Sequence, residues 1–272
     1  HFDMEQYRYK DATIETLKLL LMEDEFRART DIGVTIQAYL RDSYEDLKGW
    51  IEWAKKRAHP ITVRLVKGAY WDQETIIARQ NYWPTPVYNH KSSTDANFER
   101  VTRLLLENNE HLYAAIGSHN VRSQALALAI TKELNIPARR VEFQVLYGMA
   151  DTIATALVKQ GYRVRVYCPY GDLIPGMAYL IRRLLENTAN SSFLKQSLED
   201  RPAEELLAIP TWGEGDQDGD EVLPVPIDLP ESEVTRINPA ADVDYAVMHH
   251  REDANAALAK VKKQLGQTYL PL

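Results

Sequence analysis

The chain has only one cysteine, Cys168, among its 272 residues. A lone thiol cannot form an intramolecular disulfide, and cysteine-poor chains are typical of reducing compartments. The sequence also lacks an uninterrupted run of about 18 apolar residues, and no basic-then-apolar segment opens it, so neither a membrane span nor a secretory signal is visible. We therefore expect a soluble, cytoplasmic protein.

Several other signals are absent. The net charge is -7 and the Lys and Arg residues are scattered, which argues against nucleic-acid binding. No G-x-G-x-x-G follows an apolar run, so the usual dinucleotide fingerprint of an open sheet is missing. His119 has no second histidine or acid at ligand spacing, so we expect a neutral ring that hydrogen-bonds a cofactor or the backbone.

Short runs rich in β-branched and aromatic residues alternate with helical patterns up to about residue 200. Such alternation predicts a parallel sheet covered by helices, in a barrel or in an open doubly wound sheet. The runs lie at Gly33–Leu40, Ile61–Tyr70, Leu112–Asn120, Arg140–Met149 and Arg163–Gly171. The helical patterns include Tyr44–Ala58, Asp95–Asn108, Val121–Leu134, Ala150–Gly161 and Pro175–Thr188.

Polar residues recur at or just beyond the C-terminal ends of these runs, where a (β/α)8 barrel assembles its site from several strands. Together with the missing fingerprint, this favours the α/β class with a TIM-like (β/α)8 barrel. Five runs and a strand tail at His1–Asp3 leave the barrel about two strands short, so we expect it to be incomplete at the N-terminus. Both ends of the chain, at His1 and Leu272, look cut.

The composition turns acidic and proline-rich after the last barrel helix. We expect a barrel over 1–200, a linker over 201–238 and a helical tail over 239–272. The acidic run from Asp216 to Asp220 resembles a calcium loop, but Glu221 stands where the glycine belongs and Ile227 where the terminal carboxylate belongs. A solvated acidic turn is the better interpretation, and we expect no metal site.

Two cationic side chains in the second run suggest different chemistries. By alternation Thr62, Arg64 and Val66 share one face, so Arg64 lies in the barrel interior if that face points inward. A buried guanidinium needs a partner, either a bound ligand or an acid on a neighbouring strand. Lys67 is a candidate Schiff-base nucleophile of an aldolase-like enzyme, because a desolvated lysine loses its charge readily.

The helix after the last run carries a phenol, two guanidiniums and a carboxylate on one stripe, at Tyr179, Arg182, Arg183 and Glu186. Such a stripe can clamp a substrate carboxylate while the tyrosine shapes the pocket. The alternative is a solvated stripe stabilised by pairing of Arg182 with Glu186. Because the helix begins at the C-terminal mouth of the expected barrel, its position favours the clamp.

Six phrases of the sequence resemble the proline dehydrogenase family, especially the proline utilization A enzymes. In the family's order they are FDMEQ at Phe2–Gln6, VTIQAYLR at Val34–Arg41, RLVKGAYWD at Arg64–Asp72, GSHN at Gly117–Asn120, EFQVLYGM at Glu142–Met149 and AYLIRRLLENTANSSF at Ala178–Phe193. The resemblance implies a distorted (β/α)8 barrel that holds FAD. It also implies hydride transfer from C5 of L-proline to N5 of the flavin, giving Δ1-pyrroline-5-carboxylate.

Carried over residue by residue, the resemblance implies that Arg182 and Arg183 clamp the proline carboxylate, with Asp3 nearby to help order them. The residues that would wall the proline ring against the flavin are Tyr179, Tyr167, Leu146 and Tyr70. Those that match FAD-binding positions are Gln37, Arg64, Val66, Gly68, Trp71, Ser118, His119, Asn120, Glu186 and Phe193, with Arg64 near the flavin N5 edge. Lys67 becomes a neighbour of the cofactor, which disfavours the Schiff-base alternative.

The resemblance also implies partners beyond the barrel. In the family a quinone reoxidises the flavin, which implies transient contact with a membrane surface. The tail over 239–272 is similar to the start of the family's L-glutamate γ-semialdehyde dehydrogenase domain, whose NAD site would lie beyond Leu272. The family's first two strands, which include a substrate-binding lysine, would precede His1. A hypothesis from another class is a non-catalytic barrel remnant that serves as a scaffold, and flavin retention separates the two.

Overall fold

The computed structural model describes residues 1–188, 202–217, 243, 245 and 247–264. Its centre is a five-stranded, wholly parallel sheet with the strands in chain order. Phe2 forms a parallel bridge to Val34, so the N-terminal strand tail expected from the sequence is present as a single bridge beside the first strand. The strands are β1 (Gly33–Gln37), β2 (Ile61–Val66), β3 (Leu112–Gly117), β4 (Val141–Leu146) and β5 (Arg163–Tyr167).

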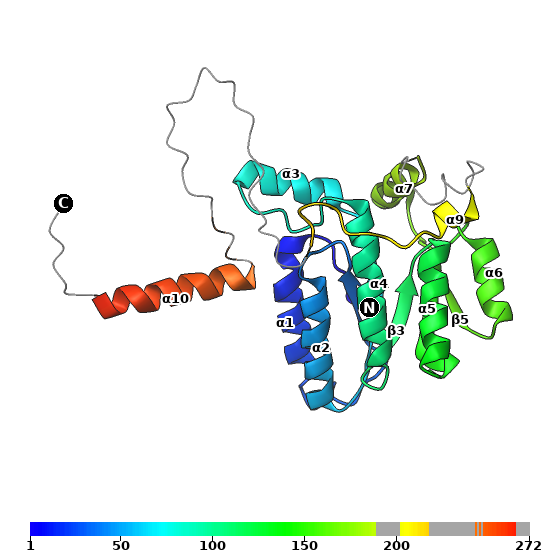
Figure 1. The fold of residues 1–272 in the computed structure, drawn as a ribbon. Helices are drawn as coiled ribbons and strands as arrows, with labels where there is room; N and C mark the ends of the chain where they lie inside the picture. The colour runs from blue at the N-terminus through cyan, green and yellow to red at the C-terminus, as the bar shows by residue number, and fades with distance from the viewer. Residues whose placement is uncertain (189–201, 218–242, 244, 246, 265–272) are drawn as a thin grey trace, which may run out of the picture.

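Helices cover one face of this sheet, where α2 contacts β1, α4 contacts β2 and β3, and α6 contacts β5 (Figure 1). None of the described helices is long and apolar enough to cross a membrane. The helices are α1 (Lys10–Leu20), α2 (Ser43–Arg57), α3 (Trp71–Asn81), α4 (Lys91–Glu107), α5 (Val121–Glu133), α6 (Asp151–Lys159), α7 (Leu173–Thr188), α9 (Ala203–Leu206) and α10 (Met248–Gln264). Short 3-10 turns lie at Tyr7–Tyr9 and Ala138–Arg140.

The helix-covered face of the sheet is apolar. Val63 and Leu65 of β2 and Phe143 of β4 are fully buried, and they pack with Trp50 of α2 and Phe98 of α4 in one core. Removing each such side chain from water contributes about 1.5–3 kcal/mol, so this face accounts for much of the stability of the sheet.

The strand residues between these buried ones point to the opposite face of the sheet, which is polar. In β2 the residues between the buried ones are half-buried, which confirms that Thr62, Arg64 and Val66 share this face. Within the described residues β1 and β5 remain the two edges of the sheet. The expectation of an α/β fold with a parallel sheet is therefore confirmed.

Each expected run contains one strand, but each strand ends before its run does. After β2 the chain leaves the sheet at Gly68, whose φ of 123° lies where residues with a side chain are strained. A Cβ at this position would also collide with the ring of Tyr39. The backbone therefore turns at Gly68, and α3, which the sequence analysis did not anticipate, follows directly.

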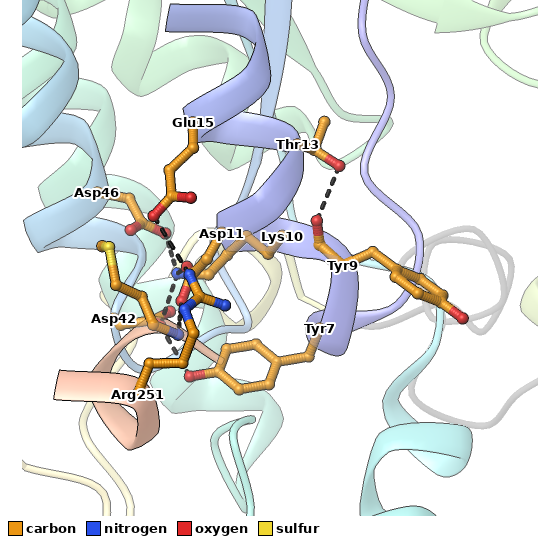
Figure 2. A network of polar contacts seen from close by, with 10 residues as sticks. Tyr7, Tyr9, Lys10, Asp11, Thr13, Glu15, Asp42, Asp46 and Arg251 are labelled. Carbon is orange, nitrogen blue, oxygen red and sulfur yellow. Dashed lines mark hydrogen bonds and ion pairs between the residues drawn. The ribbon is translucent and has the colours of Figure 1, made fainter. Parts of the chain in front are cut away.

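A buried polar network lies where α1 meets α2 (Figure 2). The ammonium of Lys10, in a residue only 5% exposed, lies 2.7 Å from both Asp42 and Asp46 and 3.3 Å from Asp11. The hydroxyl of Tyr7 donates to Asp42 at 3.0 Å. Three carboxylates thus surround one ammonium. Burial, together with the charge of Asp42, raises the pKa of Asp46 to about 7, although Lys10 opposes the shift.

The helix α10 contacts the same network (Figure 2). Its first residue, Met248, donates its backbone N–H to Asp11 at 2.6 Å, and Arg251 lies 3.3 Å from Glu15. The preceding Val247 is 5% exposed. A carboxylate at a helix N-terminus is favourable because it meets unpaired N–H groups and the positive end of the helix dipole. The part of the tail that the structure describes is therefore attached to α1.

Candidate functional site

The carboxyl ends of the parallel strands meet at one edge of the sheet, and most of the expected site residues lie there. The strand register places Gln37 beside Val66 and Leu146 beside Tyr167. The loops and helix starts that follow the strands add neighbouring positions to the same edge. The expected residues at this edge are Gln37, Val66, Gly68, Tyr70, Trp71, Ser118, His119, Asn120, Leu146 and Tyr167.

Arg64 lies on the polar face of β2 and forms an ion pair with Asp3. Thr35 donates its hydroxyl to the same carboxylate at 3.0 Å, so Asp3 is held beside β1 and β2. Of the two partners considered for Arg64, the structure contains an acid, which follows the bridge residue Phe2 and does not belong to a strand. Asp3 therefore contacts Arg64. The family resemblance had implied instead that Asp3 helps to order Arg182 and Arg183.

One donor of this guanidinium remains available. The Nε of Arg64 is buried and has no hydrogen-bond partner among the described residues. Burial also lowers the pKa of Arg64. Leaving a buried donor without an acceptor costs about 1–3 kcal/mol, so a bound molecule that offers an acceptor here would be stabilised.

The loop after β3 is ordered by its own side chains. The Oγ of Ser118 accepts the backbone N–H of Asn120 at 3.1 Å, and the side chain of Asn120 caps α5 by accepting from Ser123 at 3.1 Å. His119 Nε2 accepts the backbone N–H of Leu146 at 2.9 Å, which places the ring proton of the neutral form on Nδ1. The loop thus joins β3 to the end of β4.

His119 is neutral in this arrangement. Burial, assisted by the positive charge of Arg183, lowers the pKa of His119 to about 4. The sequence-based expectation of a neutral histidine that bonds the backbone agrees with this geometry. Its remaining N–H is a donor for a ligand or cofactor.

The two arginines of α7 lie beside tyrosine rings, one from Tyr70 at the start of α3 and one from Tyr179 of α7 itself. The guanidinium carbon of Arg182 lies 5.5 Å from the ring centre of Tyr70, and that of Arg183 lies 5.4 Å from the ring centre of Tyr179. Tyr179 in turn packs against Tyr167 of β5, with ring centres 5.9 Å apart. The two guanidiniums and three tyrosines lie together at the carboxyl edge. The contacts of Arg182 with Tyr70 and of Tyr179 with Tyr167 join α7 to other elements, which a purely solvated stripe would not do.

Charge interactions extend through this cluster. Burial is the main reason that the pKa of Tyr70 is raised, and the charges of Arg182 and Arg183 oppose the shift. A hydrogen bond with Glu5 also raises it. The phenol therefore stays protonated at neutral pH, and Arg182 and Arg183 are both close enough to act on it.

Two expected residues cannot be placed. The backbone of Glu186 belongs to α7, but its side chain is outside the described part of the structure, and Phe193 lies outside the described residues altogether. The proposed pairing of Arg182 with Glu186 therefore stays a prediction.

Lys67 lies at the same edge but faces away from the polar face of the sheet. It continues the alternation of Val63 and Leu65 toward the helices, where its ammonium forms an ion pair with Asp95 of α4. The ammonium also lies 5.5 Å from the ring centre of Phe98. Burial lowers the pKa of Lys67, while Asp95 opposes the shift. A lysine held by a carboxylate behind the sheet gives no support to Schiff-base chemistry on the polar face.

Two further cofactor candidates hold the local backbone. The side chain of Gln37, only 4% exposed, donates to the carbonyl of Met4 at 3.1 Å. The indole N–H of Trp71 donates to the carbonyl of Tyr88 at 2.8 Å, and its ring is 42% exposed. The indole is therefore anchored at one side and open to a ligand on its remaining surface.

The sequence analysis missed a carboxylate network on the polar face. Glu142 of β4 accepts two hydrogen bonds from Arg165 of β5, at 2.7 and 2.8 Å, and one from Gln144 at 2.8 Å. These bonds outweigh the effect of burial, so the pKa of Glu142 is lowered. The alternation of VEFQVL and RVRVY would have found this network, because it puts Glu142, Gln144 and Arg165 on one face.

The acidic run in the predicted linker also differs from expectation. Asp216 is fully buried and accepts hydrogen bonds from Arg41 and from two backbone N–H groups, so the expectation of a solvated turn is wrong for this residue. Asp218 and Asp220 lie outside the described residues. Across the described segments, no group of three or more His, Cys, Asp or Glu side chains is arranged to hold a metal ion.

Comparison with known proteins shows the family to which the chain belongs. The family model for proline dehydrogenase matches residues 1–196. The chain belongs to the proline dehydrogenase family. The matched residues include all five strands and α7, so the polar face and the arginine cluster both lie inside the region that the family shares.

Relatives and solved structures of proline dehydrogenases extend this match. The bifunctional protein PutA of Salmonella typhimurium is 31% identical over 272 residues, covering 95% of this chain and 20% of that protein. Proline dehydrogenase 1 of Bacillus subtilis is 32% identical over 197 residues, covering 72% of this chain and 57% of that protein. The crystal structure of proline utilization A from Bdellovibrio bacteriovorus, inactivated by N-propargylglycine, is 46% identical with a TM-score of 0.82.

That crystal structure matches 97% of this chain, and the match covers 27% of its own chain. The chain thus spans about a fifth to a quarter of the length of the bifunctional proteins that it matches.

Proposed function

We propose that this chain binds FAD on the polar face of its sheet and oxidises L-proline to Δ1-pyrroline-5-carboxylate. Family membership supports the reaction class. The observation that carries the assignment is the cluster of Arg182 and Arg183 with Tyr70, Tyr167 and Tyr179 at the carboxyl edge. Two guanidiniums beside three aromatic rings fit a small amino acid, because they match its carboxylate and its apolar ring.

The residues present fit a flavin. The buried Nε of Arg64 has no acceptor among the described residues, and an isoalloxazine ring offers acceptors at N1, O2, O4 and N5. The neutral ring of His119 keeps one N–H to donate, and the open surface of Trp71 can pack on an aromatic or ribose group. When bound, FAD would supply the hydride-accepting chemistry that no protein side chain provides.

The protein's own side chains then bind and orient the substrate. Arg182 and Arg183 hold the proline carboxylate by charge-assisted hydrogen bonds. Tyr167, Tyr179, Tyr70 and Leu146 shape the space around the ring and exclude water from it. Because Arg182 stacks over Tyr70, its position is fixed before substrate arrives, which lowers the entropy cost of binding.

We further infer that the chain is part of a PutA-type bifunctional protein with a (β/α)8 barrel. Residues 1–200 would contribute to the proline dehydrogenase barrel, 201–238 would be the linker, and 239–272 would begin the aldehyde dehydrogenase domain with its own NAD site. Bifunctional relatives that match 95–97% of this chain support this division. We also propose a cytoplasmic location, a quinone acceptor and transient membrane contact, as the sequence and the family resemblance lead us to expect.

The test is a flavin titration followed by substrate bleaching. We expect the purified chain to retain FAD or to bind added FAD, and proline added without oxygen to bleach the oxidised-flavin absorbance band. Tetrahydro-2-furoate, which has the carboxylate and ring shape without the oxidisable amine, should perturb the band without bleaching it. A chain that binds no FAD would favour the scaffold hypothesis or a barrel too incomplete to hold the cofactor, and one that binds FAD but is not bleached by proline would contradict the assigned substrate.

A further inference from the structure

Residues 207–216, which we call the strap, lie across the starts of α5 and α4 (Figure 1). Arg122 of α5 donates to the carbonyl of Leu207 at 2.6 Å. Farther along, the backbone N–H of Gly213 donates to the hydroxyl of Ser93 in α4 at 2.9 Å. The strap thus joins two helices that begin at the carboxyl edge of the sheet.

The strap ends on a buried carboxylate, Asp216. Its oxygens accept from Arg41 at 2.6 Å, from the backbone N–H of Asn89 at 2.9 Å and from that of His90 at 2.8 Å. The hydroxyl of Ser93 is a further hydrogen-bond donor to this carboxylate. Burial alone would raise the pKa of Asp216, but these hydrogen bonds hold the pKa below its usual range.

His90 is the residue that caps the N-terminus of α4, and its own side chain makes no capping bond. Asp216, 126 residues away in sequence, supplies the negative charge that this helix start favours.

The same helix start is connected to the candidate flavin site by two contacts. Tyr88, directly before Asn89, accepts the indole N–H of Trp71 at 2.8 Å. In the first turns of α4, Asp95 pairs with Lys67. Both contacts end on the segment 67–71, which carries Gly68, Tyr70 and Trp71. A shift of the loop before α4 would therefore move the indole and the backbone around it.

We propose that Asp216 is a positioning residue for the flavin site, acting through the loop before α4 on Trp71. The inference rests on the proposed function, because it assigns Trp71 to the cofactor. The family model ends at residue 196, so the strap lies beyond the region that defines the family. The segment after the barrel would then be required for a well-formed cofactor site, in addition to joining domains.

Asp216→Asn in the full chain is the decisive variant. The replacement keeps one acceptor oxygen but directs an NH2 group at a backbone N–H or at Arg41, because both carboxylate oxygens accept from donors. Glu214→Gln is the matched control, since it removes the same charge from an exposed strap residue. We expect the dissociation constant for FAD to rise about tenfold in Asp216→Asn and to stay unchanged in Glu214→Gln.

A double-mutant cycle with Trp71→Phe tests whether Asp216 acts on FAD binding through Trp71. Phe keeps a ring but cannot donate to Tyr88, so the effect of Asp216→Asn on FAD binding should shrink to less than about threefold in that background. An effect of equal size in both backgrounds would overturn the proposal, because Asp216 would then act independently of Trp71.

Backbone hydrogen exchange in the flavin-free chain gives a second readout. We expect faster exchange over 67–72 in Asp216→Asn than in Glu214→Gln, and unchanged exchange there would also overturn the inference. Failure of the wild-type chain to bind FAD would refute the proposed function, while the exchange experiment would still decide on the strap. If Asp216→Asn does not fold, Ser93→Ala, which removes the anchor for Gly213 and a hydrogen bond to Asp216, should cause a smaller change over 67–72 in the same direction.

Discussion

Asp46→Asn is expected to flatten the pH dependence of folding stability between about pH 4 and pH 7. Asp46 shares the ammonium of Lys10 with Asp42 and Asp11, and its side chain is 20% exposed (Figure 2). Asn keeps the shape and one acceptor oxygen for Lys10. It removes a charge that two neighbouring carboxylates repel.

The magnitude follows from the pKa. Burial and the charge of Asp42 raise the pKa of Asp46 from 3.8 to about 7. Between these two values the folded chain holds a proton that the unfolded chain has released, so stability falls as the pH rises through this window. At about 1.4 kcal/mol for each pH unit the full loss is about 4 kcal/mol. The pKa of about 7 already includes the opposing effect of Lys10.

The assay is urea unfolding of wild type and variant at about pH 5 and about pH 8. Wild type should lose stability between these values, whereas Asp46→Asn should lose much less and should be at least as stable as wild type at the higher pH. Asp31→Asn is the control, because Asp31 forms an exposed pair with Arg29 and its pKa is lowered out of this window. A variant that loses as much stability as wild type would show that Asp46 is not the proton-binding group.

Three further predictions concern the flavin site. Arg182→Met and Arg183→Met should each weaken proline binding by about 10- to 100-fold in steady-state kinetics while flavin absorbance stays unchanged, and unaltered kinetics in both would remove these residues from the site. Because the pKa of His119 is about 4, proline-dependent bleaching should show no step from this ring between about pH 6 and pH 8; a step there that disappears in His119→Gln would contradict a neutral histidine. Gly68→Ala should reduce stability by at least about 1 kcal/mol in chemical denaturation and lower flavin occupancy, because φ is 123° and the new Cβ meets Tyr39; full stability and full flavin content would refute the constraint.

The periodicity of apolar residues in the sequence was sufficient to predict the strands of the sheet. The runs rich in β-branched residues located all five strands of the described sheet. A strand with one face against helices needs an apolar residue at every second position, and the runs show this pattern. The same alternation placed Arg64 on the polar face, and the spacing of three and four residues placed Tyr179, Arg182 and Arg183 together on α7. The helix α3 was missed because its buried residues are only Glu74 and Ala78, which leave no apolar stripe to recognise.

The partners of the charged side chains were decided by tertiary structure alone. Nothing in the sequence indicates that Arg64 pairs with Asp3, that Lys67 turns behind the sheet to Asp95, or that Asp216 returns to the start of α4. A period of two or 3.6 residues fixes which face a side chain occupies, because that follows from backbone geometry. Which oppositely charged side chain pairs with it depends on how segments pack that lie tens to more than a hundred residues apart in the sequence. Arrangements that bury a charge without a partner are disfavoured, because such burial is costly.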